Sequence, residues 1–99
     1  MKGKFVQGGD IRKLLGLDGS MSIFDEGEFA DESFAKKHDE PGLLGMCHRS
    51  GYANTNECQF YITLGAPLTF MDKKNVVFGR IVNGMRTVKM IEQQETYNE

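Results

Sequence analysis

The chain begins with a strand-like run that ends in two glycines, and this feature constrains its fold more than any other. Phe5, Val6 and Gln7 favour an extended strand, and Gly8 and Gly9 follow them directly. Paired glycines after a strand are typical of a tight bend where the backbone passes close to another segment. The beginning of the chain therefore predicts a strand followed by a tight bend that passes close to another part of the protein.

Three later runs also predict strands. Residues 59–63 and 76–82 are rich in β-branched and aromatic side chains and are the clearest strand candidates. The short apolar run 43–47 follows a turn signal at residues 39–42 and suits a buried strand. The sequence therefore predicts a mainly β fold.

The end of the chain predicts one helix. Asn83 can cap it, and Met85, Val88 and Ile91 then fall on one helical face. We expect this helix to end near Gln94.

The stretch between the first two strands is predicted to be irregular. Residues 12–22 carry two glycines and an Asp-Gly pair, which indicate an exposed loop. Phe24, Phe29 and Phe34 recur every five residues among acidic residues, a spacing that fits neither a helix nor a strand. We interpret these three side chains as anchors of an irregular acidic segment.

Length and composition exclude several classes of protein. The 99 residues suggest one domain, and 39% hydrophobic residues, 26% charged residues and a net charge of -2 indicate neither a disordered chain nor a nucleic-acid binder. No apolar run approaches the roughly 18 residues that span a membrane, and no secretory signal precedes the first strand. We expect a cytoplasmic domain that binds neither nucleic acid nor membranes, with both cysteines reduced.

Candidates for metal binding and nucleophilic catalysis are weak. Cys47 and His48 are adjacent, so on a strand their side chains point to opposite faces, and no Cys-x-x-Cys pair exists. We expect no metal and no cofactor, a core thiol at Cys47 and a surface imidazole at His48. A more distant partner such as His38 stays open for a Cys/His pair.

Two groups of polar residues have two interpretations each. The carboxylates of residues 25–32 form either an acid/base pair or, as we expect, a solvated face. Gln7 and Gln59 either find a buried partner within their strands or lie on edge strands and face water. The residues alone leave this second choice open.

Five blocks of the sequence, in order, closely resemble the cyclophilins. They are Phe5-Val-Gln-Gly-Gly-Asp10, residues 29–34, His38 with Pro41-Gly42, residues 54–62 and Val76-Val-Phe-Gly79. The family implies a closed antiparallel barrel of eight strands with two flanking helices, and peptidyl-prolyl cis/trans isomerase activity. These 99 residues lack counterparts of the first strands, the first helix and the final strand. We therefore expect an incomplete domain over residues 1–99, a partial antiparallel β-barrel with one C-terminal helix, whose open edges favour association.

The resemblance also implies a substrate pocket. Gln7 and Gln59 match the family's two pocket glutamines, and Phe5 stands where a methionine is usual. Cys47, His48 and Arg49 correspond approximately to the family's substrate clamp, which acts through its backbone. These positions imply that the partner is a proline-containing peptide or protein segment.

Other pocket positions depart from the family. The family's catalytic arginine has no counterpart here, because its place lies before Met1. The other departures are Lys4 for an aromatic wall, Tyr61 for the phenylalanine that floors the proline slot, Phe70 for the tryptophan that many members use to bind cyclosporin, Met71 for a leucine and Asn75 for a histidine. The Tyr61 hydroxyl needs a partner, or it obstructs the slot.

Three hypotheses follow from this pattern. The chain is a weak or inactive prolyl isomerase, a non-catalytic module that binds proline-containing peptides, or a truncated product without a function of its own. We expect any ligand of the cyclosporin type to bind more weakly because of Phe70.

Overall fold

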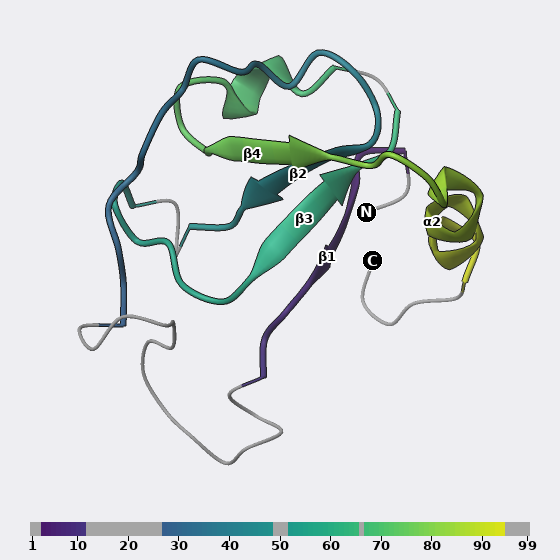
Figure 1. The fold of residues 1–99 in the computed structure, drawn as a ribbon, viewed down its shortest axis with the longest axis horizontal. Helices are drawn as coiled ribbons and strands as arrows, with labels where there is room; N and C mark the ends of the chain where they lie inside the picture. Colours follow the sequence, from purple (N-terminus) through teal and green to yellow (C-terminus); the bar gives the residue numbers. More distant parts are fainter. Residues whose placement is uncertain (1–2, 12–26, 49–51, 66, 95–99) are drawn as a thin grey trace.

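The computed structural model describes residues 3–11, 27–48, 52–65 and 67–94 (Figure 1). Its centre is an antiparallel sheet of four strands in the order β1-β3-β2-β4. The strands are β1 (Phe5–Gly8), β2 (Leu43–Met46), β3 (Phe60–Thr63) and β4 (Val77–Arg80). A C-terminal helix completes the described fold, which is mainly β and matches part of a cyclophilin-like barrel. Each predicted strand is present within the run that predicted it.

The glycines after β1 allow the close approach that the sequence predicted. Gly8 pairs with Phe60 in the register of β1 and β3. Gly9 has a φ of 93°, and a Cβ at this position would collide with the carbonyl oxygen of Cys58. A side chain would therefore push β1 away from the segment that leads into β3.

The two faces of the sheet differ in how well they are covered. On the covered face, Leu43, Tyr61 and Thr63 are each only 1% exposed. The short 3-10 helix η2 (Thr69–Met71) lies against this face, where Met71 packs with Tyr61.

The opposite face, which we call the open face, has no such cover among the described residues. Along β2 and β3 the side chains that alternate with the buried ones are half-buried or exposed; they are Leu44, Met46, Phe60 and Ile62. Phe78 of β4 is 57% exposed. An apolar sheet face of this kind is the expected interior of a barrel that these residues form only in part.

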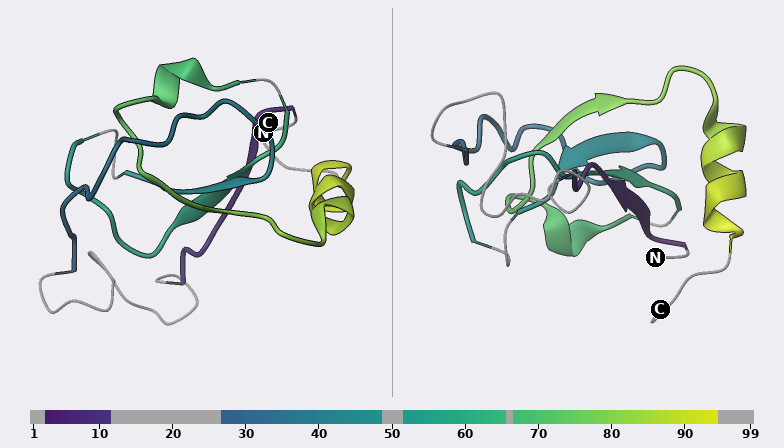
Figure 2. Two further views of the ribbon diagram at one scale, coloured as in Figure 1. Left: turned by 45° about the horizontal axis from the view of Figure 1, so that its top comes forward. Right: turned by 90° about the horizontal axis from the view of Figure 1, so that it is seen from below.

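Helix α2 (Met85–Glu92) lies beyond the ends of the strands rather than over either sheet face (Figures 1 and 2). The Nζ of Lys89 donates to the Leu64 carbonyl oxygen at 2.6 Å, and the Gly3 N–H donates to the Glu92 carboxylate at 2.6 Å. These bonds attach α2 to the residues just before β1 and just after β3, which are neighbouring strands in the sheet. Within the described residues, no helix is long and apolar enough to cross a membrane.

The predicted cap of this helix was wrong. The residue at the N-cap is Gly84, in the left-handed region with a φ of 95°, and no side chain caps the helix. A left-handed turn at this point is easiest for glycine, so it displaces Asn83 from the capping position. Val88 is buried as predicted, whereas Ile91 is 50% exposed because the helix turns only part of its apolar face to the sheet.

The irregular segment before β2 is anchored at one of the predicted phenylalanines. Phe29 forms an isolated antiparallel bridge with Asn56. Phe34 is 37% exposed, so it is a weaker anchor than predicted. The predictions for residues 12–22 and for Phe24 lie outside the described residues.

We predict that the open face causes self-association. Replacing Phe78 by serine should weaken association of the chain by roughly tenfold, because it removes a large apolar side chain that association would bury. Sedimentation velocity over a concentration series measures this effect. Phe70→Ser is the matched control. Phe70 is as exposed as Phe78, at 58%, but it belongs to η2, which lies against the covered face. An equal effect of both substitutions would contradict the role of the open face.

Candidate functional site

The two glutamines singled out in the sequence lie side by side at the edge of the covered face. Gln7 belongs to β1 and Gln59 directly precedes β3. The Nε2 of Gln7 donates a hydrogen bond to the Oε1 of Gln59 at 2.8 Å, in an exposed position. The sequence left two alternatives, a buried partner or a side chain that faces water. The structure combines them, because the two glutamines lie at the surface and also bond to each other. We call this pair the glutamine ledge.

Four predicted pocket residues meet beside the glutamine ledge. Tyr61 packs in one apolar cluster with Phe5, Cys47, Met71 and Leu68, and the rings of Phe5 and Tyr61 have centroids 5.7 Å apart. Tyr61 is only 1% exposed. A proline ring can therefore reach the face of Tyr61 only after one of these neighbours moves.

The hydroxyl of Tyr61 has the partner that its burial requires. It forms a short hydrogen bond with the Nε2 of His38. The ring lies across Gly45 of β2, where a Cβ would collide with the ring and its hydroxyl. Burial is the main cause that raises the pKa of Tyr61, with the charges of Cys47 and Asp72 adding to it. The hydroxyl therefore stays protonated and is held inside the protein.

Cys47, predicted as a core thiol, is partly buried and packs against the core cluster. It belongs to the Tyr61 cluster, and burial raises its pKa to about 11. A thiol of this kind is protonated at neutral pH and is a poor nucleophile. Both Cys47 and Cys58 are free.

The prediction of a surface imidazole at His48 was wrong. Its side chain is 5% exposed, and its Nε2 lies 2.8 Å from the Oδ1 of Asp31. The same carboxylate accepts hydrogen bonds from the Asn56 side chain at 2.8 Å and from the Asn54 N–H at 3.0 Å. Asp31 thus joins the irregular segment before β2 to the loop before β3, a long-range contact that no local pattern indicates.

These contacts also determine the charge of Asp31. Burial alone would raise its pKa, but the hydrogen bonds from Asn56, Asn54 and His48 outweigh burial and lower the pKa below its usual value. Asp31 is therefore an ionised structural group. It is not half of an acid/base pair, and the prediction of a solvated face does not hold for this residue.

The remaining predicted pocket residues are more scattered. Phe70 is exposed on η2, and Lys4 is exposed just before β1. The side chain of Asn75 donates to the Met46 carbonyl oxygen at 3.1 Å, so it secures the end of β2. Arg49 lies outside the described residues.

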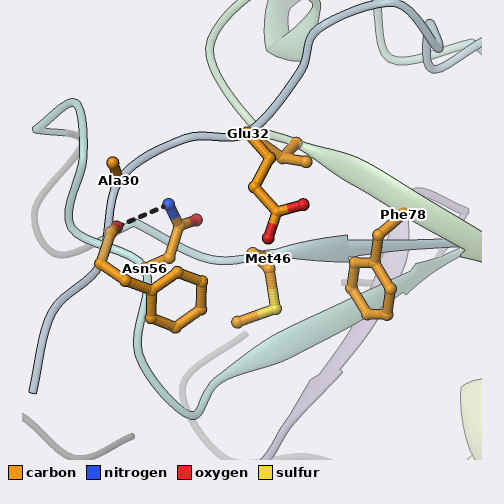
Figure 3. A pocket seen from close by; sticks show the side chains of 7 residues that line it. Ala30, Glu32, Met46, Asn56 and Phe78 are labelled. Carbon is orange, nitrogen blue, oxygen red and sulfur yellow. Dashed lines mark hydrogen bonds between the residues drawn. The ribbon is translucent and has the colours of Figure 1, made fainter. Parts of the chain in front are cut away.

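A cavity of about 360 Å³ lies away from these residues (Figure 3). Met46 and Phe78 line it from the open face of the sheet, and the segment with Phe29 and Glu32 forms another wall. Because Met46 and Tyr61 project from opposite faces of the sheet, this cavity is separate from the predicted substrate pocket.

The described part of the chain contains no group of three or more His, Cys, Asp or Glu side chains that could hold a metal ion. The chemistry that these residues can offer is therefore hydrogen bonding at the glutamine ledge and apolar contact with the cluster beside it.

Comparisons with known proteins agree with this fold. The sequence pattern of the family described as "Cyclophilin type peptidyl-prolyl cis-trans isomerase/CLD" matches residues 1–99. The chain is 48% identical over 96 residues to "Peptidyl-prolyl cis-trans isomerase H" of Rhizopus delemar, covering 97% of the chain and 52% of that protein. It is 45% identical over 96 residues to "Peptidyl-prolyl cis-trans isomerase 11" of Caenorhabditis elegans, covering 97% of the chain and 50% of that protein.

The chain belongs to the family of cyclophilin-type peptidyl-prolyl cis-trans isomerases. It spans about half the length of the curated relatives that it matches.

Sequence reasoning missed the roles of His38, Asp72 and Asp31. His38 appeared as part of a motif and as a distant partner left open for a Cys/His pair, and Asp72 lies 34 residues further along the chain. The available signal was that the Tyr61 hydroxyl, once buried, needs a partner, but nothing in the sequence identified which residue supplies it.

Asp31 should make the stability of the fold depend on acid pH. Its folded pKa is lowered, so its contribution is complete above the unfolded pKa of about 3.9 and is lost as pH falls through the lower folded value. Asp31→Asn should cost about 1–3 kcal/mol at pH 7, because an amide leaves some buried donors without an acceptor. It should also flatten the loss of stability below about pH 4.

Urea unfolding at a series of pH values measures both effects. Asp39→Asn is the control with the same change of charge, because the Asp39 side chain is 59% exposed and pairs with the exposed Lys36 at 3.2 Å. We expect this control to change stability by no more than about 0.5 kcal/mol. A control effect as large as that of Asp31→Asn would contradict the buried role of Asp31.

Proposed function

We propose that this chain binds extended proline-containing peptide segments at the glutamine ledge, with weak or no prolyl isomerase activity. The hydrogen bond between Gln7 and Gln59 carries the proposal, because it holds two amides together at the surface beside an apolar cluster. Each amide has further donor and acceptor capacity, which suits the backbone of an extended peptide. The apolar cluster suits the proline ring.

The reaction itself needs little chemistry. Rotation about an Xaa-Pro bond is opposed by amide resonance, and a catalyst has to bind the twisted amide more tightly than the planar one. No proton transfer and no covalent intermediate is needed. The absence of an activated thiol or an acid/base pair among the described residues is therefore compatible with membership of an isomerase family.

Several features support weak activity in this chain. The family's arginine, which hydrogen-bonds the proline nitrogen, has no counterpart within residues 1–99. A site without this arginine lacks a charge-assisted hydrogen bond, which is worth on the order of a hundredfold in rate. Lys4 stands where the family has an aromatic residue that forms a wall of the slot. The side chain of Asn75 already donates to the Met46 carbonyl oxygen. The ring of Tyr61 is buried and is not accessible to a proline ring.

A cyclosporin-type ligand is expected to bind weakly. Phe70 is exposed where such a ligand would lie, but it lacks the indole N–H of the family's tryptophan. Phe70→Trp should tighten binding by about fivefold, the size of one hydrogen bond, as isothermal titration would measure. No change would argue against a contact between this ligand and η2.

Peptide binding is tested by NMR titration of the full 99-residue chain with a short peptide that contains one Xaa-Pro bond. We expect shift changes at the glutamine ledge and the Tyr61 cluster. Gln59→Ala should weaken binding by about fivefold, because a hydrogen-bonding group is lost. Gln93→Ala is the matched control, since Gln93 is exposed at the C-terminal end of α2.

Exchange spectroscopy on the same samples measures isomerisation. Binding with exchange no more than a few times the uncatalysed rate supports the proposal. Shift changes confined to the open face would contradict the location of the site, and an exchange rate a hundredfold above background would contradict weak activity. No shift change at any peptide concentration would favour a truncated product without a function of its own.

A further inference from the structure

His38 is buried and uses all four of its polar groups to join two sides of the candidate site. Its backbone N–H donates to the Oδ1 of Asp72 at 2.7 Å, and its carbonyl oxygen accepts from the Leu68 N–H at 2.9 Å. Its Nδ1 lies 2.9 Å from the same Asp72 oxygen, and its Nε2 is bonded to the Tyr61 hydroxyl. Only 1% of the residue is exposed, so it does not contact a ligand itself.

The partners of the imidazole determine where its proton lies. The hydrogen bonds from the backbone and the ring of His38 lower the pKa of Asp72, so this carboxylate is ionised and can only accept. The Nδ1 therefore carries the hydrogen. In a neutral imidazole the Nε2 is then an acceptor, and the Tyr61 hydroxyl donates to it.

The two segments that His38 joins carry different parts of the apolar cluster. Tyr61 belongs to β3 and is predicted to form the floor of the proline slot. Leu68 and Asp72 lie immediately before and after η2, the short helix that carries Phe70 and Met71. A single buried side chain thus sets the position of the η2 wall relative to the Tyr61 floor.

We propose that His38, supported by Asp72, is a positioning residue for peptide binding, which it serves by fixing the spacing between Tyr61 and η2. The hydroxyl of Tyr61 connects the tyrosine to His38, a hydrogen bond that a phenylalanine at this position could not form. The hydroxyl is thereby kept out of the slot. The inference rests on the proposed peptide binding for its effect on affinity, but the arrangement itself can be tested without a ligand.

The first test is the tautomer of His38 in the unmodified chain, measured by long-range nitrogen–proton NMR correlation of the imidazole. We expect one tautomer with the hydrogen on Nδ1. Tyr61→Phe should disturb this preference, because Nε2 then loses its only donor in the described structure. A hydrogen on Nε2 in the unmodified chain, or an even mixture, would overturn the proposal.

The second test is a double-mutant cycle of His38→Leu and Tyr61→Phe. His38→Leu alone leaves the Tyr61 hydroxyl buried without a partner, and should weaken peptide binding and lower the folding equilibrium constant by roughly tenfold each. In the Tyr61→Phe background, His38→Leu should reduce peptide affinity and the folding equilibrium constant by clearly less. His38→Gln, which can still accept from Tyr61, should restore most of the affinity.

These outcomes separate the positioning role from a general loss of packing. Equal losses in both backgrounds, or a His38→Gln variant as weak as His38→Leu, would overturn the proposal. If the unmodified chain binds no peptide, the proposed function fails, while the tautomer and the unfolding cycle still decide whether His38 links Tyr61 to η2. If His38→Leu does not fold, the tautomer in the unmodified chain and in Tyr61→Phe decides alone.

Discussion

The burial of Tyr61 is the constraint on which the covered face of this protein depends. Its ring fills the space over Gly45 and contacts the cluster with Phe5 and Met71, so strands β1, β2 and β3 and helix η2 all meet at this one side chain. A phenol can occupy such a place only if its hydroxyl is bonded, because an unpaired buried hydroxyl is costly. His38 supplies that bond and connects it to Asp72.

The same arrangement explains why the candidate site has two dissimilar halves. The glutamine ledge is exposed and carries polar groups that a peptide backbone can use. The apolar half is packed and closed around Tyr61. A ligand therefore meets the amides first, and it has to displace part of an existing cluster before a proline ring can be buried.

The open face of the sheet is packed differently from the covered face. Its apolar side chains are half-buried or exposed, and the segment with Phe29 and Glu32 faces part of them only across a cavity. The chain spans about half the length of the relatives that it matches. The resemblance to cyclophilins implies that such a face is buried within a closed barrel. The covered face, by contrast, is packed by η2 and the residue before it, since Met71 and Leu68 lie against Tyr61.

The sequence by itself determined the local features of this protein. Runs of β-branched and aromatic residues predicted the strands, because these side chains fit a pleated surface, and Gly8-Gly9 predicted a close approach that only glycine allows. The collinear blocks from Phe5 onward determined the family. The sequence also indicated that Gln7 and Gln59 matter, since amides in short strands need partners.

Only the tertiary structure decided how distant residues combine. The pairing of Gln7 with Gln59, of His48 with Asp31 and of His38 with both Tyr61 and Asp72 joins positions between 17 and 52 residues apart. No periodic pattern encodes such pairs, because each depends on which loops the sheet brings together. For the same reason His48 was misjudged as a surface residue, and the buried histidine that holds the candidate site together could not be identified until the strands were in place.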